Sequence, residues 1–159
     1  MANEVANLLP KELASKLTNE LTNELTDAAL TAEAQRLVGE FALLKPSLTA
    51  AAVGAALITD AGHLYTGINL DLACGIGFCA EHSAVAEMLK HRETCVRRIV
   101  AVDDERVVAP CGRCRELLVQ IDKRNMDCVV LMPNGVRRTL RELLPDAWLE
   151  HLLVEGKRA

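Results

Sequence analysis

Apolar positions recur one helical turn apart near the start of the chain. The near-repeat LTNE-LTNE-LTD places leucines at a step of four within residues 8–27, with Pro10 suited to the first helical position. A strict step of four drifts by about 40° per repeat on a helix of 3.6 residues per turn, so the leucine stripe winds around the helix. The repeat predicts an accessory helix that packs on the body or on another subunit. A solvated extension is the alternative, because Thr and Asn are poor helix formers.

The pattern then changes from helix to strand. Apolar residues at helical spacing predict a second helix over residues 31–45, which Pro46 ends. The small and β-branched run AAVGAALITD (51–60) and the segment HLYTGIN (63–69) flank the turn-like sequence DAGH. Together they predict a β-hairpin.

Helices and strands alternate through the rest of the chain. Helical spacing returns at 80–90 and 113–122, and strand character at 98–104, 127–133 and 136–140. This alternation predicts an α/β sandwich around a mixed sheet of about five strands. No second domain boundary is visible. We therefore divide the chain into an accessory helix (1–30) and one functional domain (31–159).

Composition narrows the class of protein. At 159 residues the chain is about one domain long, and half of its residues are apolar. The formal net charge of −4 lacks the basic excess that binding to a phosphate backbone requires, so we expect no nucleic-acid partner. The longest apolar run, 50–58, is far shorter than the roughly 20 residues that a bilayer requires. The N-terminus does not resemble a secretory signal, and we expect a soluble, cytoplasmic protein without membrane partners.

The six cysteines are the first candidates for chemistry. In a reducing compartment they are thiols, ligands or core residues rather than a disulfide framework. Cys111 and Cys114 form a C-x-x-C motif directly before a predicted helix. Taken alone, this motif fits half of a zinc site, a dithiol redox pair or coincidence.

A second cysteine-containing stretch, GFCAEHSAVAEM, has Cys79, Glu81 and His82 within four positions. Like the C-x-x-C motif, it follows an extended segment and starts a helix. Both motifs therefore place thiols where backbone N–H groups and the positive end of the helix dipole favour thiolates. Thiolates are the form of cysteine that binds zinc.

Spacing alone leaves two kinds of zinc site open. Cys79, His82, Cys111 and Cys114 would make a closed Cys3His site of the structural type. The three cysteines alone would leave the fourth position to water, as catalytic zinc sites do, and Glu81 would then be the proton carrier. A chain with this much apolar periodicity has little need of a structural zinc ion. The x-E after the first ligand and the later P-C-x-x-C are the zinc-deaminase signature.

These motifs resemble a known family. The CAE at 79–81 followed by PCGRC at 110–114 is similar to the zinc motif of cytidine deaminases in its three-cysteine form. The segments VGAAL (53–57), TGIN (66–69) and RELLPDAW (141–148) resemble segments at corresponding places in cytidine deaminases and in blasticidin S deaminase. The resemblance covers roughly residues 31–150. It implies a three-layer α-β-α sandwich with an extra N-terminal helix.

The resemblance also implies an activity and a set of site residues. It points to Zn²⁺-dependent hydrolytic deamination of a cytidine-type nucleoside, in a homotetramer that serves pyrimidine salvage. A modified cytosine compound of the blasticidin S type is the alternative substrate. The implied roles are metal binding by Cys79, Cys111 and Cys114, proton transfer by Glu81, substrate contact by Asn69, Asp71, Ala80 and Trp148, and support of the thiolates by His82, Arg113 and Arg115.

Some positions depart from the family pattern. Asp71 stands where the family has a longer acid, and Leu72 where another Asn is expected. Two interpretations of Trp148 are open: it stacks on a base, in its own site or in that of a neighbouring subunit, or it belongs to the core. For the three remaining cysteines we expect small buried side chains: Cys74, Cys95 and Cys128.

Three other functions compete with this interpretation. A thioredoxin-like redox protein would leave Cys79 and Glu81 unexplained. A nucleic-acid deaminase shares the chemistry but lacks the positive charge. A binding protein with a closed structural zinc site remains open at this point.

Overall fold

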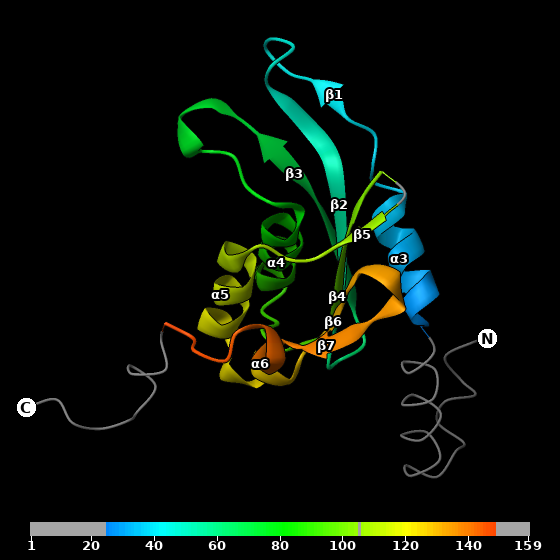
Figure 1. The fold of residues 1–159 in the computed structure, drawn as a ribbon, viewed down its shortest axis with the longest axis vertical. Helices are drawn as coiled ribbons and strands as arrows, with labels where there is room; N and C mark the ends of the chain where they lie inside the picture. Colours follow the sequence, from blue (N-terminus) through cyan, green and yellow to red (C-terminus); the bar gives the residue numbers. More distant parts are fainter. Residues whose placement is uncertain (1–24, 105, 149–159) are drawn as a thin grey trace, which may run out of the picture.

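The computed structural model describes residues 25–104 and 106–148, and within them the chain forms one mixed sheet with helices on both faces (Figure 1). The strands are β1 (Phe41–Ala42), β2 (Thr49–Thr59), β3 (Leu64–Asp71), β4 (Val96–Asp103), β5 (Arg106–Val108), β6 (Val129–Leu131) and β7 (Arg137–Thr139). The helices are α3 (Asp27–Gln35), α4 (Ala80–Lys90), α5 (Gly112–Ile121) and α6 (Leu140–Leu143), with short 3-10 turns η1 (Ala73–Gly75), η2 (Lys123–Asp127) and η3 (Pro133–Gly135). The predicted α/β sandwich is confirmed.

The sheet order is β1-β2-β4-β6-β7, with β3 also paired to β2 and β5 also paired to β4. The predicted hairpin is confirmed as β2 and β3, which pair antiparallel with Leu57 opposite Tyr65. Strand β6 runs parallel to β4, which makes the sheet mixed. Seven strands form here rather than about five, because β1 and β5 are only two and three residues long and leave no readable pattern.

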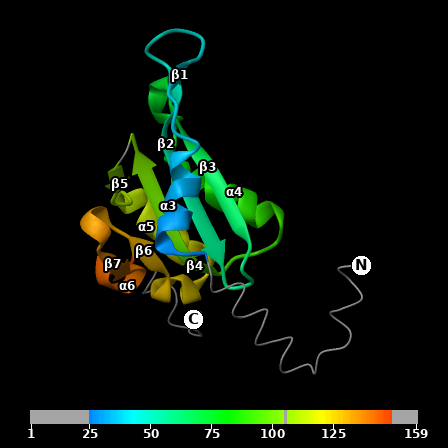
Figure 2. The same ribbon diagram turned by 90° about the vertical axis from the view of Figure 1, so that its right-hand side faces the viewer.

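Alternate residues of the central strands supply two separate cores. Ala55 and Leu57 of β2 belong to the cluster under α4 and α5, whereas Ala56 and Ile58 belong to the cluster under α3. Figure 1 shows the sheet between α3 on one side and α4 and α5 on the other, and Figure 2 looks onto the face that α3 covers. The three layers thus follow from the two-residue period of β2.

Two glycines let the helices approach the sheet closely. A Cβ on Gly54 would lie 2.1 Å from the carbonyl oxygen of Ala34 in α3. A Cβ on Gly67 of β3 would lie 2.3 Å from the backbone nitrogen of Ala84 in α4. Both distances are far below van der Waals contact, so each position needs a residue without a side chain.

The helix predicted over residues 31–45 is wrong at both ends. It starts at Asp27, capped by the Thr26 side chain, and ends at Gln35. Beyond it, the Gly39 amide donates to the Ala51 carbonyl, and Phe41 pairs with Ala50 in the sheet. Pairing with β2 therefore overrides the helical spacing. The accessory helix predicted from the LTNE repeat lies almost entirely outside the described residues.

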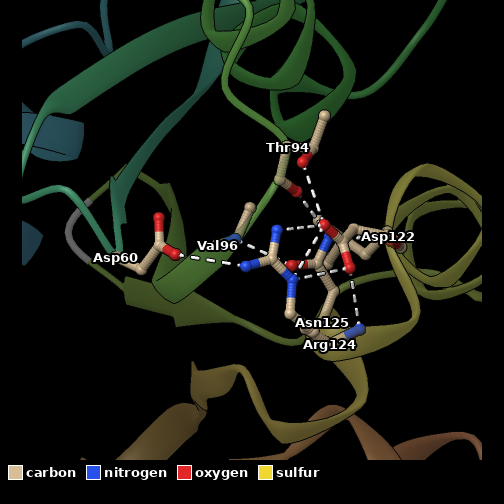
Figure 3. Close-up of polar contacts among 7 residues, drawn as sticks. Asp60, Thr94, Val96, Asp122, Arg124 and Asn125 are labelled. Carbon is tan, nitrogen blue, oxygen red and sulfur yellow. Dashed lines mark hydrogen bonds and ion pairs between the residues drawn. The ribbon is translucent and has the colours of Figure 1, made fainter.

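Asn125 joins the end of α5 to the start of β4 (Figure 3). This fully buried side chain accepts a hydrogen bond from the Val96 amide at 2.7 Å. Its NH2 group donates to the carbonyls of Thr94 and Leu118 at 3.0 and 2.9 Å. Because every polar atom of the amide is used, Asn125 fixes η2 against both elements.

A surface ion-pair network extends this anchor (Figure 3). Asp122 accepts a hydrogen bond from the Thr94 hydroxyl at 2.9 Å and pairs with Arg124 at 2.6 Å. Arg124 also reaches Asp60 in the turn after β2, at 3.5 Å. The Arg124 guanidinium, above all, lowers the pKa of Asp122 to about 2.

Candidate metal centre

Two helix N-termini bring the predicted thiols together. Cys79 is the N-cap residue of α4 and Cys111 is the N-cap residue of α5, and neither sulfur caps its own helix. Cys114 lies in the first turn of α5 and is buried. Three sulfurs thus face one point from two adjacent helix starts, where the helix dipoles favour negative charge.

The spacing of the sulfurs fits a tetrahedral metal ion. The Sγ atoms of Cys79 and Cys111 are 3.6 Å apart, and those of Cys111 and Cys114 are 3.4 Å apart. Sulfurs at about 2.3 Å from a tetrahedral Zn²⁺ ion would be about 3.8 Å from each other. All three sulfurs lie within 4.8 Å of one another, the only such group of three donors within residues 25–104 and 106–148. The donor set therefore fits zinc with small adjustments.

The pKa values of the three thiols indicate that the cluster needs a cation. Burial raises the pKa of Cys79 and of Cys114. Burial also acts upward on Cys111, but hydrogen bonds from the backbone and thiol of Cys114 outweigh it and lower the pKa of Cys111. A cation would therefore be needed to keep all three groups deprotonated.

His82 lies beside the cluster and not within it. Its Nδ1 is 3.6 Å from the sulfur of Cys114, a distance at which an imidazole N–H can donate to sulfur. It does not join the group of donors within 4.8 Å of one another. Burial, followed by the charge of Arg113, lowers the pKa of His82. The geometry thus matches the predicted hydrogen bond to a ligand sulfur better than a fourth ligand.

Glu81 lies in the first turn of α4, two residues after Cys79, and only 5% of it is exposed. Burial raises the pKa of its carboxyl, while its own backbone N–H and the Cys114 thiol act in the opposite direction. A buried carboxyl beside a candidate metal site is the expected arrangement for a group that takes up and releases a proton.

Cys79, Cys111 and Glu81 line a cleft of about 500 Å³. Asn69, Asp71, Ala80 and Arg113, which were predicted from the resemblance, all line it. The Asn69 side-chain oxygen accepts a hydrogen bond from the Val53 amide at 2.8 Å. Its NH2 group is therefore the part of the side chain that a ligand can use.

Other residues of the cleft had escaped the sequence analysis. The chain after β3 folds back, so that Leu70 and Phe78 exchange two backbone hydrogen bonds of 2.9 and 3.0 Å. A Cβ on Gly77 would lie 2.5 Å from the Leu70 carbonyl oxygen, so this fold-back requires a glycine there. The isolated Gly75 and Gly77 were the available signal. The lining residues found only in the structure are Val53, Leu70, Leu72, Gly75, Gly77, Phe78, Val108 and Ala109.

The two arginines do not contact the sulfurs as expected. Arg113 donates to the Gly77 carbonyl at 3.3 Å. Arg115 donates to the carbonyls of Pro110 and Leu143 at 2.9 and 3.1 Å. Arg113 thus holds the Gly77 segment that lines the cleft, whereas Arg115 joins the start of α5 to the end of α6.

Trp148 does not line the cleft of its own chain. Its side chain is 64% exposed, so the alternative that it belongs to the core is wrong. Its backbone N–H donates to Glu116 at 3.3 Å. Stacking in a neighbouring subunit's site stays a prediction.

The remaining cysteines differ from one another. Cys128 is buried as predicted, Cys95 is half-buried, and Cys74 is exposed, so the expectation for Cys74 is wrong. Cys74 lies in η1 with a φ of 60°, in a segment that turns sharply at the rim of the cleft and has no core to face.

The sequence of this chain is similar to those of known deaminases. Residues 27–132 match the family model described as the cytidine and deoxycytidylate deaminase zinc-binding region. Cytidine deaminase from Mycobacterium tuberculosis is 35% identical over 100 residues, which cover 61% of this chain and 72% of that protein. Blasticidin-S deaminase from Bacillus cereus is 37% identical over 106 residues, which cover 58% of this chain and 74% of that protein.

Solved structures agree with the sequence comparison. The crystal structure of cytidine deaminase from Mycobacterium tuberculosis aligns with a TM-score of 0.62 and 28% identity, covering 77% of this chain and 98% of that one. Cytidine deaminase from Burkholderia pseudomallei aligns with a TM-score of 0.63 and 27% identity, covering 77% and 99%. The alignments thus take in nearly the whole of those enzymes.

Proposed function

Because the chain belongs to the cytidine and deoxycytidylate deaminase family, we propose that it is a zinc-dependent hydrolase that converts a cytidine-type nucleoside to its uridine-type product and ammonia. The observation that carries this proposal is the group of three sulfurs at the start of α4 and α5, next to a buried glutamate and an open cleft. A thioredoxin-like redox protein would need only two of these thiols. Glu81 and Cys79 would then have no role.

Cys79, Cys111 and Cys114 would hold the zinc ion. When bound there, zinc supplies Lewis-acid activation of water at neutral pH. The helix N-termini at Cys79 and Cys111 offset the negative charge of the thiolates, an effect of about 0.3 to 2 kcal/mol each. The N–H of His82 would further support the Cys114 sulfur.

Glu81 would move the protons. Its position two residues from Cys79, buried in the lining of the cleft, would let one carboxyl take a proton from water and deliver it to the ring nitrogen. The same carboxyl would then assist the departure of ammonia. Because Glu81 is only 5% exposed, these transfers would compete little with bulk water.

Asn69 and Asp71 would bind the sugar. They are two residues apart on β3 and both line the cleft, with the amide of Asn69 oriented by the Val53 N–H. The Ala80 segment lines the same cleft. Since Asp71 is exposed and short, its carboxylate would reach the hydroxyl groups of a substrate at the mouth rather than at the bottom.

A modified cytosine compound is the second candidate substrate. The specific observation in its favour is the 37% identity to blasticidin-S deaminase from Bacillus cereus, which exceeds the 35% to cytidine deaminase from Mycobacterium tuberculosis. A closed structural site is less favoured, because His82 does not complete the group of sulfur donors.

We further propose a cytoplasmic homo-oligomer, a tetramer by family resemblance, that serves pyrimidine salvage without nucleic-acid or membrane partners. Large apolar side chains exposed on the described chain support an oligomer: Phe41, Leu43, Leu44, Ile76 and Trp148. Within the described residues no helix is both long enough and apolar enough to span a bilayer. The net charge of −4 weighs against nucleic acid.

The test is a screen for ammonia release with cytidine, deoxycytidine, cytosine, guanine nucleosides and blasticidin S, with zinc content measured on the same sample. We expect about one zinc per chain and release from a cytidine-type compound. No release from any of these compounds by a zinc-loaded sample would overturn the proposed function.

Replacement of the proton carrier gives a sharper test. Glu81→Gln should keep zinc and fold but lower kcat by roughly 10² to 10⁴, the usual contribution of a positioned acid–base group. Glu33→Gln on α3, which does not line the cleft, is the matched control and should stay active. Turnover by Glu81→Gln close to that of the unaltered protein would refute the role of Glu81.

A further inference from the structure

Arg115 holds the backbone around Cys111, the most exposed of the three clustered cysteines. Its backbone N–H donates to the carbonyl of Cys111 at 3.1 Å, in the first turn of α5. Its side-chain Nε donates to the carbonyl of Pro110 at 2.9 Å. That carbonyl belongs to the peptide bond that joins Pro110 to Cys111. One residue therefore binds the peptide groups on both sides of Cys111.

The guanidinium of Arg115 is itself held in place. Its Nη1 donates to the carbonyl of Leu143 at 3.1 Å. Leu143 is the last residue of α6, where the final carbonyls of a helix lack partners within the helix. Leu143 and Leu144 pack against the core under α4 and α5, which fixes the position of this acceptor. The planar guanidinium, with donors in fixed directions, thus joins two carbonyls that belong to different elements.

The other two cysteines have supports of their own. Cys114 is buried in the first turn of α5, so the helix itself sets its position. The residue before Cys79 exchanges two backbone hydrogen bonds with β3. Cys111 instead precedes its helix, is exposed, and does not cap the helix with its sulfur. The place of its sulfur therefore depends on the backbone that Arg115 binds.

We propose that Arg115 is a positioning residue of the metal centre, which holds Cys111 at metal distance through the carbonyls of Pro110 and Leu143. This role rests on the proposed zinc site and adds a link from the metal ligands to α6. The hydrogen bonds of Arg115 go to the backbone, so it acts on the position of the ligand rather than on the charge of the sulfur. Because zinc requires each sulfur at about 2.3 Å, a displaced Cys111 would bind the ion less completely.

The experiment starts from the whole zinc-loaded chain, titrates zinc away with a chelator of known affinity, and then replaces it by Co²⁺. Arg115→Ala should bind zinc about 10- to 100-fold more weakly. Its Co²⁺ form should have a weaker sulfur-to-cobalt charge-transfer absorption per bound ion, because one thiolate is bound less completely. Arg141→Ala is the matched control and should behave as the unaltered protein, since it removes an arginine of α6 that pairs only with the exposed Asp127, at 3.1 Å.

The variant Arg115→Lys separates position from charge. A lysine keeps the positive charge, but its ammonium cannot serve both carbonyls with the geometry of a guanidinium. We therefore expect Arg115→Lys to bind zinc more weakly than the unaltered protein, with the absorption changed in the same direction as in Arg115→Ala. If Arg115→Ala does not fold, Arg115→Lys decides the matter.

Three results would overturn the positioning role. The first is zinc affinity and absorption in both Arg115 variants equal to those of Arg141→Ala, even where the unfolding free energy falls, because the arginine would then serve stability alone. The second is full recovery by Arg115→Lys, because charge would then suffice. The third is an unaltered protein without zinc, which would overturn the metal centre as well. Ammonia release is not measured, so a wrong substrate would leave this test intact.

Discussion

Substitution of Gly67 tests how the sheet positions the metal centre. Gly67 lies on β3 directly under α4. A Cβ there would be 2.3 Å from the backbone nitrogen of Ala84, 2.6 Å from Cβ of Ser83 and 2.8 Å from the carbonyl oxygen of Ala80. Ordinary contacts begin at 3.4 Å, so α4 would have to move away from the sheet by about 1 Å.

That movement has two measurable costs. Forcing extra volume into a packed contact costs about 1 to 3 kcal/mol of unfolding free energy, and the helix backbone cannot rotate aside as a flexible side chain can. The first turn of α4 carries Glu81, and Cys79 is the N-cap residue of that helix. Since a misplacement of about 1 Å can cost about 10² in rate, Gly67→Ala should lower kcat/KM by about that factor.

The assay combines urea unfolding followed by circular dichroism, zinc analysis and kcat/KM for the substrate identified in the ammonia screen. Gly39→Ala is the matched control, because a Cβ on Gly39 meets nothing within 4 Å and that residue has no positive φ. We expect Gly39→Ala to behave as the unaltered protein. A Gly67→Ala protein with unchanged unfolding midpoint and unchanged kcat/KM would refute the inference that close contact at Gly67 positions the site.

Two further predictions concern single side chains. His82→Ala should keep one zinc per chain but bind it about 10- to 100-fold more weakly in competition with a chelator, because Cys114 loses a hydrogen-bond partner. Complete loss of zinc after dialysis would instead indicate that His82 is a ligand. Arg124 and Thr94 hold the pKa of Asp122 near 2, against 3.8 for the free group, so the carboxylate stabilises the folded state above pH 3.8 and this contribution is lost as pH falls towards 2. Asp122→Asn should therefore lower the unfolding free energy by about 1 to 2 kcal/mol at pH 7, allowing for screening of the exposed guanidinium. The difference in unfolding free energy between the variant and the unaltered protein should vanish near pH 2. A difference that does not change with pH would contradict this assignment.

Local spacing was a good guide wherever a motif lies within one element. The hairpin of β2 and β3 followed from small and β-branched residues on both sides of a turn. The helix starts after Cys79 and Cys111 followed from the periodicity downstream of each cysteine. These features depend on neighbours a few residues away, so the sequence contains them directly.

Prediction failed where a distant segment competes for the same residues. Phe41 has helical spacing with the residues before it, yet it pairs with Ala50 in the sheet. Backbone hydrogen bonding of the chain after α3 to β2 replaces the helix there. Likewise, Arg113 and Arg115 were expected at the sulfurs, whereas their hydrogen bonds in the structure go to backbone carbonyls. No local pattern reveals which of several possible partners lies nearest.

The sequence by itself therefore determined which donors the chain offers: three thiols and a glutamate, each at or just inside the start of a helix. Only the tertiary structure decided that Cys79 and Cys111, 32 residues apart, bring their sulfurs within 3.6 Å, and that His82 lies beside the group of three. The physical reason is that residue spacing sets the face of an element on which a side chain lies, whereas distances between elements depend on how closely helices pack on the sheet.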